Sequence, residues 1–144
     1  MKLFAQRLKA FLLVLAVLVS LIPAASAAQA RASYYFSRTE DYAIALGSGK
    51  VLVEFDVVST HTMTTLGAST VYIYEKQSDG SYEKVKTYTR ATVSNMLQSN
   101  TTHAYCSITY QGKAGTKYYA VVNYYAKDAS GYENYKSATN TVTA

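Results

Sequence analysis

Residues 51–59 alternate strictly between an apolar set of side chains and a mixed set. The apolar set is Val51, Val53, Phe55 and Val57, and the mixed set is Leu52, Glu54, Asp56 and Val58. Neighbouring residues of a β-strand point to opposite faces, so this pattern predicts a strand with one buried face. Similar runs recur to the end of the chain, and no sustained apolar stripe at helical spacing follows residue 30. The sequence therefore predicts an all-β protein.

Clusters of turn-forming residues divide the chain into about seven expected strands. These cover residues 34–46, 51–59, 70–76, 82–88, 102–110, 117–126 and 135–143. The segment 60–68 is expected to be a connection with one helical turn that buries Met63 and Leu66, and residues 92–100 a loop or short helix. Short strands at a spacing of about ten residues predict a single antiparallel β-sandwich, immunoglobulin-like in type. A small antiparallel barrel is the alternative.

The composition agrees with strands and leaves packing as the source of stability. The chain has 15 tyrosines, no tryptophan and no proline after Pro23. Its single cysteine excludes an internal disulfide. Strand alternation places Cys106 with Ile108 and Tyr110 on what should be the core face, which predicts a buried, inert thiol. A reactive or intermolecular thiol is the alternative.

The first 30 residues have the three parts of a secretory signal peptide. A basic head is followed by an apolar run at 11–22, by Pro23, and by small residues that offer cleavage after Ala27 or Ala30. An uncleaved anchor is the alternative, but a spanning helix needs about 20 apolar residues and this run is shorter. We therefore expect a signal peptide helix at 1–30 and one secreted domain at 31–144. It would be extracellular or held in the cell envelope, and would meet the membrane only during export.

Charge and motifs argue against several function classes. From residue 31 onward there are 11 Lys and Arg against 9 Asp and Glu, with the signs interspersed, so no nucleic-acid partner is expected. His61 and His103 lie in no metal-ligand spacing, and no serine sits in a G-x-S-x-G turn. Glu54 and Asp56 share a strand face and are interpreted as a solvated pair. The oxygen-bearing segment 128–134 is interpreted as a surface turn rather than a calcium loop. We expect no catalytic residues, no metal and no cofactor.

Three segments near the C-terminus resemble the last hairpin of fibronectin type III and related immunoglobulin-like domains. They are residues 115–126 (GTKYYAVVNYYA), 128–131 (DASG) and 137–142 (SATNTV). In that family a Gly-Thr-x-Tyr entry leads into a Val-rich strand, a glycine-bearing loop and a Ser/Thr-rich last strand. The whole chain is also similar to short, uncharacterised exported sandwich proteins of Gram-positive bacteria. The resemblance implies a fold and a compartment, and no activity.

Tyrosine is the one residue type in clear surplus, and alternation sorts its members into two sets. If Ala120 and Val122 face the core, then so do Tyr118 and Tyr124. The outward set on two strands expected to share a sheet is Tyr72, Tyr74, Tyr119 and Tyr125. These four form a candidate binding surface, because tyrosine offers an apolar ring and a hydroxyl. Cross-strand pairing that only stabilises the sheet is the alternative, and inverted alternation would bury the four instead.

The function expected from the sequence is a secreted, non-catalytic binding or interaction module. Its partner would be an extracellular glycan or protein, contacted through the exposed tyrosines. The first alternative is a structural or self-associating extracellular protein that pairs through the edge of the last strand. The second is a small secreted hydrolase or toxin. The oligomeric state is left open by the sequence.

Overall fold

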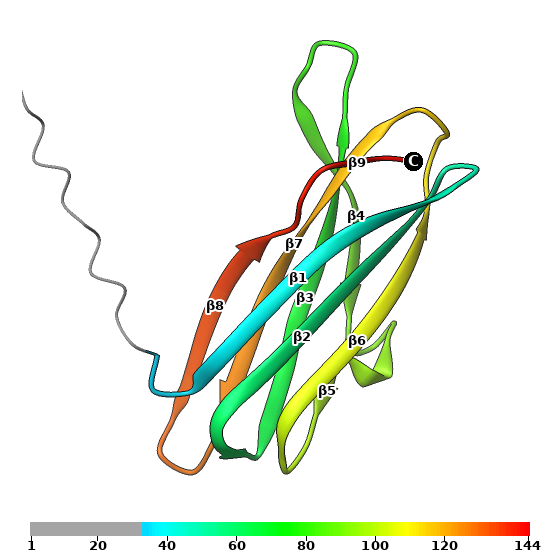
Figure 1. Cartoon of the computed structure of the whole chain (residues 1–144). Coiled ribbons are helices and arrows are strands. Elements are labelled where there is room, and N and C mark those ends of the chain that lie inside the picture. Colours follow the sequence, from blue (N-terminus) through cyan, green and yellow to red (C-terminus); the bar gives the residue numbers. More distant parts are fainter. Residues whose placement is uncertain (1–32) are drawn as a thin grey trace, which may run out of the picture. The chain divides into compact units, whose positions relative to one another are not determined.

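A computed structural model describes residues 33–144 of the chain as two antiparallel sheets (Figure 1). The first sheet has three strands in the order β1-β2-β6. They are β1 (Phe36–Gly47), β2 (Lys50–Met63) and β6 (Thr101–Gln111). The expected signal peptide at 1–30 lies outside the described residues. Within residues 33–144, no helix is long and apolar enough to cross a membrane.

The second sheet has six strands and forms the other layer. Its main path is β4-β3-β7-β8, with β5 pairing to β3 and β9 pairing to β7. These strands are β3 (Thr65–Lys76), β4 (Tyr82–Thr89), β5 (Leu97–Gln98), β7 (Lys117–Lys127), β8 (Tyr132–Ala138) and β9 (Val142–Thr143). One 3-10 turn, η1 (Ser94–Met96), precedes β5. For residues 33–144 the all-β, antiparallel prediction is confirmed, with seven long strands and two very short ones.

The segment 60–68 was expected to contain a helical turn, and that prediction is wrong. Strand β2 continues to Met63 and β3 begins at Thr65, so the chain passes between the sheets through a sharp bend. Met63 and Leu66 are fully buried, as expected. They reach the core by strand alternation on either side of the bend, which needs no helical turn.

The expected last strand at 135–143 is also wrong in its bounds. Strand β8 begins earlier, at Tyr132, and ends at Ala138, and β9 pairs separately with β7. The break falls at Thr139, whose hydroxyl accepts a hydrogen bond from the Ala120 amide at 2.9 Å. The Thr139 amide donates to the Ala120 carbonyl, also at 2.9 Å. A side chain thus replaces one bond of the ladder, and the chain leaves the sheet there.

The residue after this break, Asn140, joins the two sheets. Its carboxamide oxygen accepts from the Ala43 amide at 2.9 Å, and its nitrogen donates to the Ala43 carbonyl at 3.0 Å. The side chain therefore makes the two hydrogen bonds that a neighbouring strand would make to β1. An unpaired strand edge invites pairing with another chain, so this contact also covers part of an edge.

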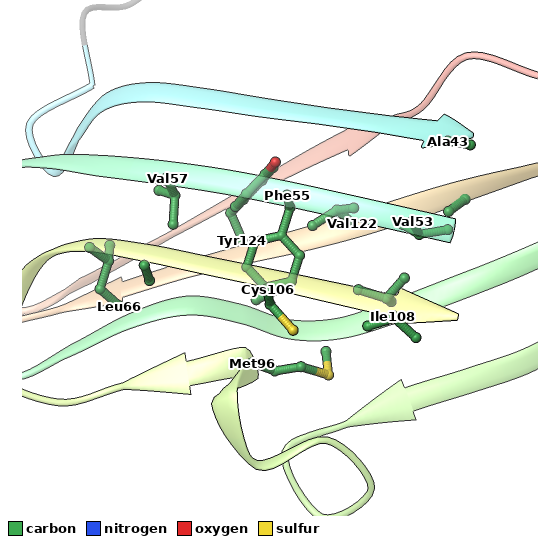
Figure 2. Packing of buried hydrophobic residues seen from close by; sticks show 14 of the residues in the cluster. Ala43, Val53, Phe55, Val57, Leu66, Met96, Cys106, Ile108, Val122 and Tyr124 are labelled. Atoms are coloured by element: carbon green, nitrogen blue, oxygen red, sulfur yellow. The ribbon is translucent and has the colours of Figure 1, made fainter. Parts of the chain in front are cut away.

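The core lies between the sheets, where the inward residues of both interdigitate (Figure 2). Phe55 from β2 packs against the ring of Tyr124 from β7, with centroids 5.9 Å apart. The Tyr124 hydroxyl donates to the Glu40 carbonyl at 2.8 Å, so the ring is buried without an unsatisfied polar atom. Burial, with the nearby Asp41 carboxyl, strongly raises the pKa of Tyr124.

Cys106 is fully buried on β6, as its position on the core face predicted (Figure 2). Its thiol lies 3.4 Å from the Asn95 side-chain oxygen. Burial raises the pKa of the Cys106 thiol to about 11. Because the thiolate is the reactive form, this environment suits an inert thiol.

Candidate binding face

The structure places the four candidate tyrosines on the outward side of the six-stranded sheet. Their inward neighbours Tyr118 and Tyr124 are fully buried, while all four candidates are half-buried. Tyr72 and Tyr74 lie on β3, and Tyr119 and Tyr125 lie on β7; the two strands share a sheet, as expected, and pair directly within it. The prediction that Tyr118 and Tyr124 face the core and that the four candidates face outward is therefore correct.

Three of the four lie together, in an aromatic cluster made of Tyr72, Tyr74, Tyr119 and Tyr82. Tyr74 and Tyr119 are direct cross-strand partners, and their rings stack with centroids 4.9 Å apart and an interplanar angle of 5°. Tyr82, from β4, meets Tyr119 edge-on at 4.9 Å. The Lys84 ammonium lies 4.6 Å from the centre of the Tyr72 ring, within cation–π range.

The fourth candidate, Tyr125, is separated from that cluster along β7. It pairs laterally with Gly67, and its ring stacks on Tyr132 of β8 with centroids 6.0 Å apart. It lies six positions along β7 from Tyr119, a distance of about 20 Å in a strand. The four tyrosines therefore do not form one continuous patch. They form the aromatic cluster and a second tyrosine pair at the other end of the sheet.

An open depression of about 470 Å³ lies between these two groups. Its lining combines hydroxyls, amides, one lysine and two tyrosines, of which Tyr135 has an inward position and stacks on Tyr124. The lining residues are Ser69, Thr70, Tyr72, Asn123, Asn134, Tyr135 and Lys136. Ser69 is the extra residue of a bulge in β3, where the pairing shifts between Ala68 and Thr70. The bulge interrupts the regular sheet surface beside the depression. The Asn123 amide donates to the Thr70 hydroxyl at 2.7 Å and orients two of the lining groups.

Lysines occupy the same outward side of the sheet. Strand alternation and pairing place Lys76, Lys84, Lys117, Lys127 and Lys136 on it, and all five are exposed. The acidic residues of these strands, Glu75, Glu83 and Glu133, have the opposite alternation. We call this outward side the tyrosine–lysine face. It consists of these five lysines and six tyrosines, which are Tyr72, Tyr74, Tyr82, Tyr119, Tyr125 and Tyr132.

The outward side of the three-stranded sheet has the opposite charge. Glu54 and Asp56 lie side by side on β2, and Glu40 of β1 pairs with Asp56. Arg38 contacts Asp56 at 3.0 Å, and the His103 imidazole lies 2.9 Å from the same carboxyl. Hydrogen bonding to Glu54 raises the pKa of Tyr105. Glu54 and Asp56 therefore share an exposed face, as expected, and are engaged by surrounding side chains.

Both histidines have an aspartate neighbour, the arrangement that would favour an enzyme. The His61 Nε2 atom lies 2.7 Å from Asp128 Oδ2 and the His103 Nε2 atom 2.9 Å from Asp56 Oδ2. The His103–Asp56 pair lies within the three-stranded sheet, the His61–Asp128 pair joins β2 to the turn after β7, and neither borders the depression. His61 instead lies edge-on to Tyr34, with ring centres 5.5 Å apart.

The segment 128–134 is a turn organised around Asp128. Its Oδ1 atom accepts from the amides of Ser130 and Gly131 at 2.7 and 3.1 Å, and Oδ2 meets His61. The hydrogen bond with His61, followed by those to the two amides, lowers the pKa of Asp128. Both carboxyl oxygens are thus already engaged by the protein. Within residues 33–144, no group of three or more His, Cys, Asp or Glu side chains is placed to hold a metal.

Sequence reasoning missed several components of the tyrosine–lysine face. Tyr82 and Tyr132 join it from neighbouring strands, and Asn123, Asn134 and Lys136 line the depression. The outward orientation of the five lysines could have been predicted from the sequence, because each lies an even number of residues from an outward tyrosine on the same strand. Which strands are neighbours, however, had to be known before those signals could be combined.

Fold and face together define a two-sheet antiparallel sandwich with an aromatic, basic outer surface on its larger sheet. No protein-family model and no curated protein matches this sequence significantly.

Proposed function

We propose that this protein is a secreted, non-catalytic binding module that contacts an extracellular glycan or protein through the tyrosine–lysine face. The observation that carries the proposal is the depression between the aromatic cluster and the Tyr125–Tyr132 pair. Its volume falls within the range of about 300–1,000 Å³ found for ligand sites. Tyrosine rings flanked by amides and hydroxyls can contact both apolar and polar parts of a partner.

We further propose that the fold of this protein is related to that of fibronectin type III and immunoglobulin-like domains. In chain order the seven long strands are β1, β2, β3, β4, β6, β7 and β8. The first, second and fifth of them (β1, β2, β6) share one sheet, and the fourth, third, sixth and seventh (β4, β3, β7, β8) share the other. An immunoglobulin constant-type sandwich has the fourth strand in the first of these sheets. Here it pairs with the third strand, and this order supports a fibronectin type III-like arrangement.

Co-sedimentation of the purified protein with cell-wall material and common polysaccharides tests the proposal. The test variant replaces Tyr72, Tyr74, Tyr119 and Tyr125 by Ser, and circular dichroism checks that it is folded. Because Tyr74 and Tyr119 stabilise each other, Tyr72→Ser combined with Asn134→Ala is a milder second variant. Replacement of the exposed Tyr34 and Tyr105 by Ser is the matched control. The proposal fails if folded face variants retain every interaction of the unmodified protein.

A structural, self-associating role is the second candidate, and it rests on the position of β8. That strand is the last of its sheet, so one of its sides pairs with no strand of the described residues. Such an edge can pair with a second copy. Sedimentation at increasing protein concentration tests this role, and a strictly monomeric result at the highest concentration would contradict it.

A further inference from the structure

The two outer surfaces of the sandwich differ in charge far more than the composition indicates. The tyrosine–lysine face carries five lysines and no carboxylate at its outward strand positions. The opposite surface carries Glu40, Glu54 and Asp56 against Arg38 and Lys50 at its outward strand positions. A surface of one sign attracts partners of the opposite sign. The charge of the tyrosine–lysine face therefore selects an anionic partner.

The lining of the depression indicates the chemical groups that this partner carries. Asn134 offers an amide that can both donate and accept hydrogen bonds. The Ser69 hydroxyl donates to the Asn123 carbonyl and the Thr70 hydroxyl accepts from the Asn123 amide, which leaves acceptor sites on both hydroxyls and on the Asn123 side-chain oxygen. Such neutral groups complement the hydroxyls of a sugar. Lys136, at the same depression, would pair with a carboxylate by a charge-assisted hydrogen bond. Together these groups match a sugar ring that bears a carboxylate.

The dimensions of the face favour a polymer over a single sugar. Lys117 and Lys127 are at opposite ends of β7, about 33 Å apart at the usual rise of a strand. The four strands from β4 to β8 span about 14 Å in the perpendicular direction. Lysines distributed over this area can contact several charged units of one chain at once.

The arrangement of the rings favours a glycan over a single-stranded nucleic acid. Binding of nucleic-acid bases uses free aromatic faces on which successive bases stack. In the aromatic cluster, Tyr74 and Tyr119 each use one ring face on the other, and Lys84 covers one face of Tyr72. These contacts occupy ring planes on which bases would otherwise stack.

We propose that the tyrosine–lysine face binds an acidic polysaccharide, with a carboxylate-bearing sugar in the depression and the surrounding lysines along the chain. This inference rests on the proposed function and specifies the class of its ligand. It predicts that binding requires both the carboxylates of the polymer and the lysines of this face.

The test uses polygalacturonate, its highly methyl-esterified form and neutral dextran as immobilised ligands for the purified protein. Esterification removes the charge of the polymer and keeps its backbone. The test variant is Lys84→Gln with Lys136→Gln. The matched control is Lys50→Gln with Lys86→Gln, which removes the same charge at exposed positions that do not face outward from the larger sheet. A single-stranded oligonucleotide serves as a second polyanion.

We expect binding to polygalacturonate that weakens as salt is raised to physiological strength, because exposed charges are then screened. Loss of one charge-assisted contact should weaken binding about tenfold. The test variant should show at least that loss, and the control variant should bind like the unmodified protein.

Three results would overturn the inference. Equal binding to the esterified or neutral polymer, lost with the tyrosine variant and kept with the lysine variant, would leave the proposed function standing without an acidic ligand. Binding to the oligonucleotide as tight as to polygalacturonate would make the partner a polyanion in general. Absence of binding to polygalacturonate would exclude this ligand class, and the proposed function would then depend on its own tyrosine test.

Discussion

Glu75 is the clearest case of a single residue whose environment sets its role. It is almost completely buried on β3, and its carboxyl oxygens accept from the Lys113 ammonium at 2.7 Å and the Tyr118 hydroxyl at 2.9 Å. The Lys113 amide in turn donates to the Tyr118 hydroxyl at 2.9 Å. The hydrogen bonds from Lys113 and Tyr118 lower the pKa of Glu75. This network fixes the loop between β6 and β7 to the larger sheet.

Glu75→Gln should therefore destabilise the protein at neutral pH. We expect the free energy of unfolding to fall by about 1–2 kcal/mol, because hydrogen bonds to a charged group are lost. Because the pKa of Glu75 is lower in the folded protein than in the unfolded chain, its ionised carboxylate stabilises the fold at pH values above the unfolded pKa of about 4.3. This stabilisation is lost as the pH falls through the pKa of the folded protein. Urea unfolding of both proteins should show a difference at pH 7 that shrinks below about pH 4. A difference independent of pH would contradict this explanation.

The Cys106 thiol provides a second prediction at this scale. Because the thiol is buried and its pKa is raised to about 11, a disulfide reagent at mildly alkaline pH should react only when the protein unfolds. The measurement is the reaction of native protein and of protein in urea, followed by absorbance. Rapid, complete reaction of the native protein would contradict the structure.

The close approach between β3 and the crossover segment that joins β4 to β6, which contains η1, depends on one glycine. Gly67 has φ +143°, and a Cβ atom there would lie 2.0 Å from the Met96 carbonyl oxygen. The backbone of β3 can approach the crossover only because this side chain is absent. Met96, whose carbonyl oxygen lies next to Gly67, is fully buried in the core.

Gly67→Ala should move the crossover and cost more stability than an alanine at another left-handed glycine. The matched control is Gly80→Ala, since Gly80 has φ +88° and no atom within 4 Å of an added Cβ. We expect about 1 kcal/mol for the control, from backbone conformation alone, and roughly 2–4 kcal/mol for Gly67→Ala. Thermal and urea unfolding measure both variants. Equal losses would show that the close approach to Met96 is unimportant.

At the level of elements, the sequence allowed accurate prediction wherever alternation was regular. The inward set on β2 and the two sides of β7 were assigned correctly, because Val53, Phe55, Ala120 and Val122 have no bulge to shift them. The prediction was wrong at 60–68, where one bend reverses the chain without a helical turn, and at Thr139, where a hydroxyl substitutes for a backbone group. Such replacements depend on partners distant in sequence.

The candidate face was only partly predictable for the same reason. Alternation identified the sidedness of Tyr72, Tyr74, Tyr119 and Tyr125, but pairing decides that Tyr125 lies apart from the others. The depression depends on β8 lying beside β7, and the lysine distribution emerges only when four strands are placed in order. Interspersed charges along the chain thus become segregated charges in the folded molecule.

For the molecule as a whole, Asn140 makes one of the hydrogen-bonded ties between the two sheets. The Asn140 side chain bonds both backbone groups of Ala43, across from its own sheet. Asn140→Ala should lower the free energy of unfolding by about 1–3 kcal/mol, because Ala43 is buried and its amide and carbonyl lose their partners. It should also promote aggregation through the uncovered edge of β1.

The neighbouring Thr141→Ala is the control for this prediction, since Thr141 is exposed. Chemical unfolding and light scattering on storage measure stability and aggregation. If Asn140→Ala behaves like Thr141→Ala in both, the contact does not hold the sheets together.

The opposite charges of the two outer surfaces have a consequence for how the protein separates on charged media. From residue 33 onward there are ten Lys and Arg against nine Asp and Glu, so the described part has almost no net charge at neutral pH. An ion-exchange matrix, however, meets one surface at a time. We expect weak retention at low salt on cation exchangers, through the five lysines, and also on anion exchangers, through Glu40, Glu54 and Asp56. The isoelectric point would therefore be a poor guide to its chromatography, and Lys84→Gln with Lys136→Gln would weaken only the first of the two modes.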